Sequence, residues 1–225
     1  MTKQIHDDLI TLTNPRSPAS EAFRTLRTNI EFSSLDDPIR TLVVTSAGQG
    51  EGKSTTLANL AIATAQAGKR VILADCDLRK PSLQDLFGTP SETGITSMVV
   101  DGQFLENPPL LDTDIPGLFL LPSGPLPPNP SELLASRRME EIINALTGQA
   151  DMVFFDTPPV VAVTDAAVLS TKVGGVLLVV SAGKTKREHA RRAIALLERV
   201  NARLIGTVLN NAPLDSVVQG YYAQA

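Results

Sequence analysis

The sequence contains no tryptophan and a single cysteine, and aromatic residues make up only 4% of its 225 positions. One cysteine excludes an internal disulfide and is typical of a reducing compartment. No apolar run approaches the ~20 residues that a membrane-spanning helix needs. The first residues also lack the apolar stretch of a secretory signal. We therefore expect a cytoplasmic protein without direct membrane insertion, whose core is built from aliphatic side chains.

The charge balance is mildly acidic, with a net charge of −4 at pH 7. This argues against nucleic acid or anionic lipid as a partner. The basic stretch "KTKREHARR" at 184–192 is the exception. Because Ala190, Ile194 and Leu197 give the same predicted helix an apolar stripe, we expect its charges to lie on a solvated face.

Short, continuous apolar runs dominate the rest of the chain, and such runs are typical of strands buried on both faces of a sheet. They cover residues 41–46, 70–75, 118–123, 151–156, 175–180 and 204–210. Helical patterns lie between several of them. The alternation predicts one α/β domain over 1–225, with a doubly wound, mostly parallel sheet and helices on both faces. We expect an additional helix at about 17–33 and a flexible tail at about 213–225.

The first apolar run leads directly into "TSAGQGEGKSTT" and then into a helical pattern, which is the setting that a P-loop requires. Glycines let backbone amides surround phosphate oxygens, and the helix N-terminus favours negative charge. Lys53 is expected to reach the β- and γ-phosphates, and the Ser54 hydroxyl to bind Mg²⁺. Ala47 replaces the first glycine of the pattern, so that bend must use angles open to alanine. The predicted ATP-binding residues are Gly50, Glu51, Gly52, Lys53, Ser54 and Thr55.

Three aspartates follow two other apolar runs, in "VILADCDLRKP" and "MVFFDTPP". The carboxyl ends of parallel strands share one edge of a sheet, so we expect Asp75, Asp77 and Asp156 to converge on Lys53. Beside a triphosphate they can hold Mg²⁺, or one can accept a proton from an attacking hydroxyl. The alternative is that they only cap the turns after their strands. Cys76 is interpreted as a small residue at a strand end.

These motifs together resemble those of the bacterial tyrosine kinases (BY-kinases) of capsule and exopolysaccharide export, in their stand-alone cytoplasmic form. "GEGKST" is similar to the Walker A motif of that family, "VILADCDLRKP" to its Walker A′ motif and "FFDTPP" to its Walker B motif. "LPSGPLPPNPSELL" resembles a loop common in the family, and "EAFRTLR" fits its N-terminal Glu-x-x-Arg-x-x-Arg motif. The resemblance implies a P-loop NTPase fold and an ATP- and Mg²⁺-dependent protein-tyrosine kinase.

The resemblance also implies roles for individual residues. Lys53, Asp75 and Asp77 would be catalytic, with Asp75 as the base, although the division of roles among the aspartates stays open. Ser54, Asp77 and Asp156 would organise the metal. Asn210 resembles the position that reads the adenine edge, with Asn211 as the alternative. The subunit contact of a ring-shaped oligomer would include Glu21, Arg24 and Arg27.

The only two tyrosines, Tyr221 and Tyr222, stand together near the C-terminus. By resemblance they are phosphoacceptors, modified by a neighbouring subunit of the ring, although members of the family commonly carry more tyrosines. An inert tail is the alternative. The resemblance further implies a transmembrane activator, which would recruit the protein to the inner face of the cell membrane.

Two other functions remain open from the sequence. A MinD/ParA-like ATPase would carry a lysine five residues before Lys53, but that position is Gly48. A nucleotide-sensing regulator of polysaccharide export that phosphorylates nothing would keep the same nucleotide site. It would differ from the kinase only in transferring no phosphate to protein.

Overall fold

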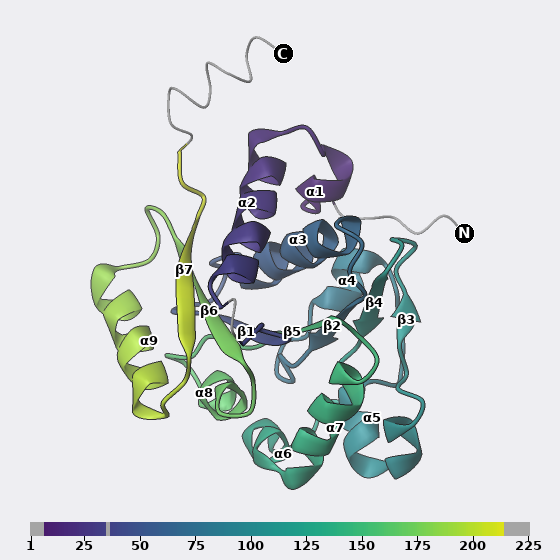
Figure 1. The fold of residues 1–225 in the computed structure, drawn as a ribbon. Helices are drawn as coiled ribbons and strands as arrows, with labels where there is room; N and C mark the ends of the chain where they lie inside the picture. The colour runs from purple at the N-terminus through teal and green to yellow at the C-terminus, as the bar shows by residue number, and fades with distance from the viewer. Residues whose placement is uncertain (1–6, 35–36, 214–225) are drawn as a thin grey trace.

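The computed structural model describes residues 7–34 and 37–213, and the chain forms a single sheet with helices on both sides (Figure 1). The predicted tail with Tyr221 and Tyr222 lies outside the described residues, apart from residue 213. The strands are β1 (Thr41–Ser46), β2 (Val71–Asp75), β3 (Leu111–Asp112), β4 (Leu118–Leu121), β5 (Met152–Asp156), β6 (Gly175–Ser181) and β7 (Leu204–Asn210).

The sheet has the order β3-β4-β2-β5-β1-β6-β7. All neighbouring pairs are parallel except β3 and β4. The six predicted strands are confirmed to within about two residues at each end. The edge strand β3 was not predicted, because two residues are too few to give a periodic signal.

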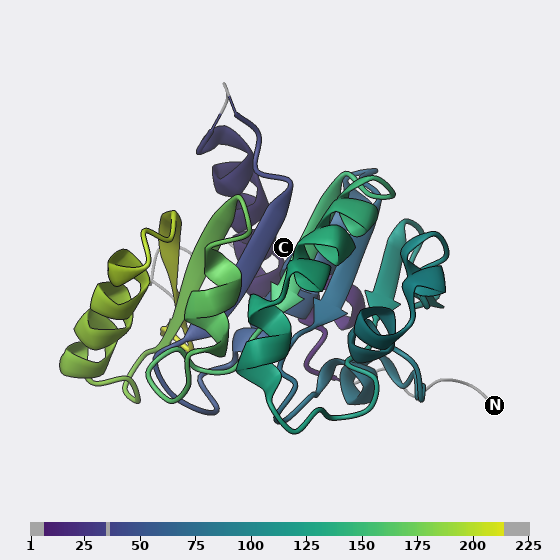
Figure 2. The ribbon, with the colours of Figure 1, turned by 90° about the horizontal axis from the view of Figure 1, so that it is seen from below.

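Helices cover both faces of the sheet. One face carries α1 (Ile10–Thr13), α2 (Pro18–Phe32), α3 (Lys53–Gln66) and α4 (Leu83–Phe87). Figure 2 shows the opposite face. It carries α5 (Ile95–Val100), α6 (Pro130–Ala135), α7 (Arg137–Thr147), α8 (Asp165–Ser170) and α9 (Arg187–Arg199), with the 3₁₀ turn η1 (Gly102–Leu105) beside α5.

The central strands are buried on both faces, which explains why they stand in the sequence as continuous apolar runs. All six residues of β1 are buried. Leu42 and Val44 face the core under α3, whereas Val43 faces the core under α7 and α8. Phe154 and Phe155 of β5 are the largest fully buried side chains among the described residues, one in each core.

Helix α2 begins where the sequence predicts a helix. The Ser17 hydroxyl accepts a hydrogen bond from Ser20 N at 3.2 Å, and Pro18 occupies the first helical position. Both features are typical of helix N-termini. Ile30 of α2 packs into the core formed with α3, so α2 belongs to the body of the domain. No helix in 7–34 or 37–213 has the length and apolar character to cross a bilayer.

Candidate active site

The phosphate loop connects β1 to α3 at the carboxyl edge of the sheet. Gly50 and Gly52 have φ of 65° and 85°, which places both in the left-handed region that glycine adopts most easily. Ala47 has no positive φ, so the bend at the pattern's first glycine is made at angles alanine tolerates. Gly52 is the N-cap of the 14-residue helix α3. The loop therefore directs the N-terminus of α3 at the space where a phosphate would bind.

Lys53 lies among oxygen atoms from three different segments. Its Nζ is 3.0 Å from Asp77 Oδ2 and 3.3 Å from Asp156 Oδ2, and it donates to Ser54 Oγ at 3.0 Å. Ser54 Oγ donates to Asp156 Oδ2 at 2.5 Å. Burial alone would lower the pKa of Lys53, but the charges and hydrogen bonds of Asp156 and Asp77 outweigh it and raise that pKa. Lys53 is therefore held in its charged form.

Asp75 and Asp156 are paired in register on the adjacent strands β2 and β5, and both are fully buried. Burial, followed by the charge of Asp156, raises the pKa of Asp75 to about 7. Burial also raises the pKa of Asp156, against the opposing effect of Lys53 and Ser54. The structure therefore brings the three carboxylates together, as predicted. Asp77 and Asp156 contact Lys53 directly, and Asp75 lies beside Asp156.

Two of the aspartates also cap turns, as the alternative interpretation expected. Asp75 Oδ2 accepts hydrogen bonds from Ser82 N at 2.9 Å and Leu83 N at 3.0 Å, at the start of α4. Asp77 Oδ1 accepts from Lys80 N at 3.0 Å. Asp75 and Asp77 thus hold the backbone of the segment after β2 and also belong to the carboxylate cluster near Lys53.

An ion pair between Arg79 and Asp165 was not predicted from the sequence. Arg79 Nε and Nη2 donate to the two carboxylate oxygens of Asp165 at 2.8 and 3.0 Å. Asp165 is completely buried at the first turn of α8, 86 positions further along the chain. This bidentate pair fixes the segment that carries Asp77 to the start of α8. Cys76 between the aspartates is buried, and burial raises the pKa of its thiol, which suits a structural residue.

The asparagines at the end of β7 contact the phosphate loop and the end of β6. Asn210 Nδ2 donates to Glu51 O at 3.0 Å, and Asn210 Oδ1 accepts from Asn211 N at 2.9 Å. Asn211 Nδ2 donates to Ser181 Oγ at 3.0 Å. Both asparagines lie close to the phosphate loop, and the reading of the adenine edge by Asn210 or Asn211 stays a prediction.

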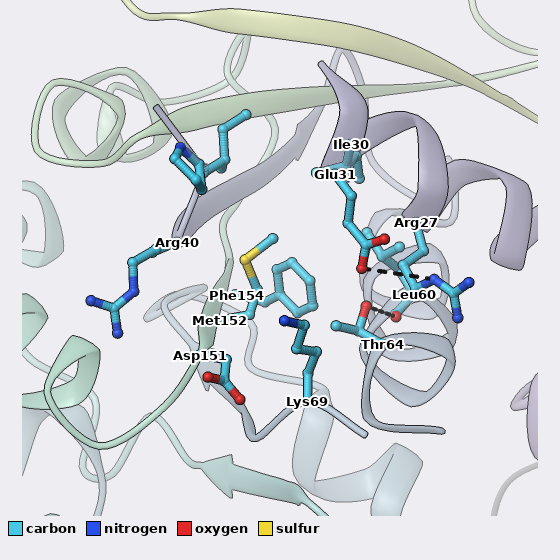
Figure 3. A pocket seen from close by; sticks show the side chains of 12 residues that line it. Arg27, Ile30, Glu31, Arg40, Leu60, Thr64, Lys69, Asp151, Met152 and Phe154 are labelled. Atoms are coloured by element: carbon cyan, nitrogen blue, oxygen red, sulfur yellow. Dashed lines mark hydrogen bonds and ion pairs between the residues drawn. The ribbon is translucent and has the colours of Figure 1, made fainter. Parts of the chain in front are cut away.

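The three residues of the predicted subunit contact differ in exposure. Arg24 Nη1 donates to Glu21 Oε2 at 2.8 Å, and both side chains are accessible on α2. Arg27 is less exposed than Arg24. It donates to Ala63 O at 3.3 Å, and its Nε lies 4.0 Å from Glu31 Oε1 in an ion pair. It borders a cavity of about 330 Å³ at the amino edge of the sheet (Figure 3). This cavity is lined by Met152 at the start of β5 and lies at the edge opposite Lys53, so it is separate from the phosphate loop.

Two hollows flank the phosphate loop and share Gly50 and Lys53. One, of about 320 Å³, extends toward Ser82 and Asp85. The other, of about 340 Å³, is lined by Asp77, Arg79 and Lys80 on one side. Pro158, Pro159, Ala162 and Val163 line its other side. A group bound over Lys53 is thus accessible from two directions.

The residues around Lys53 fit a Mg²⁺ ion whose other ligands are phosphate and water. No group of three or more His, Cys, Asp or Glu side chains in the described part of the chain is arranged to hold a metal ion. One oxygen each of Ser54, Asp77 and Asp156 does lie within 3.3 Å of the Lys53 ammonium, so these three oxygens are close together. Mg²⁺ in nucleotide sites takes only one or two protein oxygens and completes its shell with phosphate and water. The donor set fits a nucleotide-bound magnesium ion.

A parallel sheet, a glycine-rich loop and a lysine at the head of the following helix define a P-loop nucleotide-binding domain. The family described as CobQ/CobB/MinD/ParA nucleotide binding domain matches residues 42–217. Within this class the chain belongs to the bacterial tyrosine kinase family, as its relatives show.

Three of these relatives illustrate the similarity. The tyrosine-protein kinase YwqD of Bacillus subtilis is 43% identical, over 96% of this chain and 91% of its own length. The putative tyrosine-protein kinase CapB of Staphylococcus aureus is 36% identical, over 92% and 91%. The solved kinase domain of the Escherichia coli tyrosine kinase ETK has a TM-score of 0.87 at 32% identity, with 96% of this chain and 85% of that chain covered.

Proposed function

We propose that this protein is an ATP- and Mg²⁺-dependent protein-tyrosine kinase that phosphorylates its own C-terminal tyrosines and thereby regulates capsular or exopolysaccharide synthesis and export. The observation that carries the proposal is the cluster of Lys53, Ser54, Asp77 and Asp156 at the head of α3. The relatives named tyrosine-protein kinases support the kind of reaction.

Each residue of the cluster has a task in this reaction. The amides of residues 50–55 and the Lys53 ammonium bind and orient the triphosphate, and they stabilise the charge that develops on the γ-phosphoryl oxygens during transfer. Ser54, Asp77 and Asp156 would hold the magnesium ion. When bound, that ion would neutralise part of the charge on the phosphates. The tyrosine oxygen forms a bond to the γ-phosphorus as the bond to the bridging oxygen of ADP breaks.

Asp75 is the proposed acceptor of the tyrosine proton. A base is most effective when its pKa lies near the working pH, and the pKa of Asp75 is about 7. Its carboxylate is completely buried and accepts hydrogen bonds from the amides of Ser82 and Leu83, so a tyrosine can reach it only if the segment from 77 to 83 moves aside. Asp77, whose side chain is 6% exposed and forms an ion pair with Lys53, is the alternative base.

The acceptors are proposed to be Tyr221 and Tyr222, presented to a neighbouring subunit in a ring-shaped oligomer. Glu21 and Arg24 are accessible on α2 and available to a partner. Arg27, also partly exposed on α2, would join them. A transmembrane activator that recruits the kinase to the inner face of the membrane completes the proposal, and this part rests on family membership.

Transfer between subunits can be tested by mixing two variants. A Lys53→Met protein with an intact tail supplies tyrosines but no activity, and an active protein truncated after residue 213 supplies activity but no tyrosines. We expect phosphate on the Lys53→Met chain only in the mixture. If the mixture leaves that chain unmodified although intact wild-type protein phosphorylates itself, transfer occurs within one subunit.

The function itself is tested by incubating the purified protein with ATP and Mg²⁺ and measuring its intact mass. The kinase gains one or two phosphates, and treatment with a tyrosine phosphatase removes them. Release of free phosphate without any gain in mass would favour a MinD/ParA-like ATPase. Nucleotide binding with neither product would favour a sensor that phosphorylates nothing.

A further inference from the structure

The outer side of the phosphate loop is bound by the turn that follows β6. Thr185 Oγ1 donates to Glu51 Oε1 at 2.6 Å, and Lys184 Nζ donates to Gly50 O at 2.7 Å. Ser181 N donates to Thr185 Oγ1 at 2.8 Å, which orients the hydroxyl from within its own turn. Two consecutive residues of the turn therefore hold two consecutive residues of the loop, across 134 positions of sequence.

The Glu51 carboxylate connects the beginning of the loop to its end. Its Oε2 accepts a hydrogen bond from Ala47 N at 3.0 Å, while its Oε1 accepts from Thr185. The residue is only 4% exposed. A β-carbon added at Gly48 would lie 3.1 Å from Oε1, so the loop closes tightly around the carboxylate. A buried carboxylate with both oxygens engaged resists any change in the curvature of the loop.

The same network extends to β7. Asn210 Nδ2 donates to Glu51 O at 3.0 Å, and Ala182 N donates to Asn210 O at 2.8 Å. A β-carbon at Gly52 would lie 2.0 Å from Asn210 Nδ2, so this side chain packs directly against the N-cap of α3. The phosphate loop is thus supported by β7 as well as by the turn after β6.

We propose that Glu51 and Thr185, assisted by Lys184, are positioning residues for the triphosphate of ATP. The proposal rests on the nucleotide-binding function proposed above. None of the three side chains needs to touch the phosphates. Their contacts hold the carbonyl of Gly50 and the interior of the loop, which leaves the loop amides preorganised toward the ligand. Preorganised donors bind developing charge without a cost of rearrangement at the moment of reaction.

A purely structural role would give a different result from a positioning role. Structural bonds lower the melting temperature when removed but leave the ATP affinity of the folded protein unchanged. Positioning bonds act on phosphate binding in both the ground state and the transition state. Their loss therefore raises KM for ATP more than it lowers kcat.

The decisive variants are Thr185→Val, which keeps the shape of the side chain without its hydroxyl, and Thr185→Ser, which restores the hydroxyl. Lys184→Met removes the second contact, and Lys186→Met is its matched control, since it removes a nearby exposed charge. The probe is a fluorescent ATP analogue titrated in the presence of Mg²⁺. We expect Thr185→Val to bind about 10-fold more weakly than wild type, because a hydrogen bond to a buried charge is lost. Thr185→Ser and Lys186→Met should bind like wild type, and Lys184→Met about 3-fold more weakly.

The proposal is overturned if Thr185→Val and Thr185→Ser both bind as wild type does, or if Lys184→Met and Lys186→Met weaken binding equally. If Thr185→Val does not fold, the exposed Lys184→Met and its control decide the matter. The titration requires no phosphate transfer. The expected affinity pattern without phosphotyrosine in any variant would support the positioning role while refuting the proposed kinase. If phosphotyrosine forms but all variants bind the ATP analogue as wild type does, the kinase proposal stands and the positioning role is refuted.

Discussion

The buried carboxyl of Asp75 makes the stability of this protein depend on pH in a way that can be calculated. Its pKa is about 7 in the folded state, against an ordinary value of 3.8. Between these two values the folded state binds the proton that the unfolded state has released. Since stability falls with rising pH wherever the folded state binds more protons, the stabilisation is complete at low pH and is lost as the pH rises toward 7.

The size of the effect follows from the same two pKa values. From about pH 5 to about pH 8, the free energy of unfolding should fall by about 2–3 kcal/mol because of Asp75. For a chain of this length this corresponds to a decrease in melting temperature of roughly 5–10 °C. The raised pKa of Asp156 acts in the same direction. The raised pKa of Lys53 has no effect in this window, because both states keep that proton.

The assay is urea denaturation of wild type and Asp75→Asn across this pH range without nucleotide. The Asp75→Asn side chain carries no titratable proton, so the stability of this variant should change less with pH by about 2–3 kcal/mol over the range. Asp101→Asn is the control, because Asp101 is exposed and caps η1 in a way that asparagine can also provide. Equal pH dependence of wild type and Asp75→Asn would refute the assignment of a raised pKa to Asp75.

Three further predictions concern the same site. Arg79→Ala leaves the buried Asp165 without its bidentate partner. Because Arg79 itself is partly exposed, the free energy of unfolding measured in urea should fall by about 2 kcal/mol. A loss below about 0.5 kcal/mol would mean that the pair contributes little to stability. Chelation of Mg²⁺ with EDTA should abolish phosphate incorporation from ATP, and restored magnesium should recover it. Transfer that persists in EDTA would contradict the metal-binding role of Ser54, Asp77 and Asp156. If Asp75 is the base, kcat/KM should rise with pH through about 7, and Asp75→Asn should remove that rise.

Much of the fold could be predicted because the sheet is buried on both faces. Strands such as β1 and β5 are buried at every position, and each ends next to residues of the candidate site. Helix α2 was predicted from the spacing of its apolar residues. By contrast, the two-residue β3 and the four-residue α1 carry too few residues to produce a pattern.

The candidate site could be predicted where its residues belong to one local segment. The phosphate loop and the carboxylates at strand ends are of this kind, because strand order in a parallel sheet brings their ends together. The partners Arg79 and Asp165, or Glu51 and Thr185, come from segments far apart in the sequence. Nothing near Thr185 indicates which carboxylate it will meet, so these contacts became visible only in the folded chain.

We propose that phosphate passes from ATP to a C-terminal tyrosine through the site around Lys53. Mapping of phosphorylated residues by tandem mass spectrometry, in wild type and Lys53→Met after incubation with ATP and Mg²⁺, tests it most directly. We expect phosphate on Tyr221 or Tyr222 in wild type and none in Lys53→Met. Unmodified tyrosines in both proteins, or equal modification in both, would contradict it.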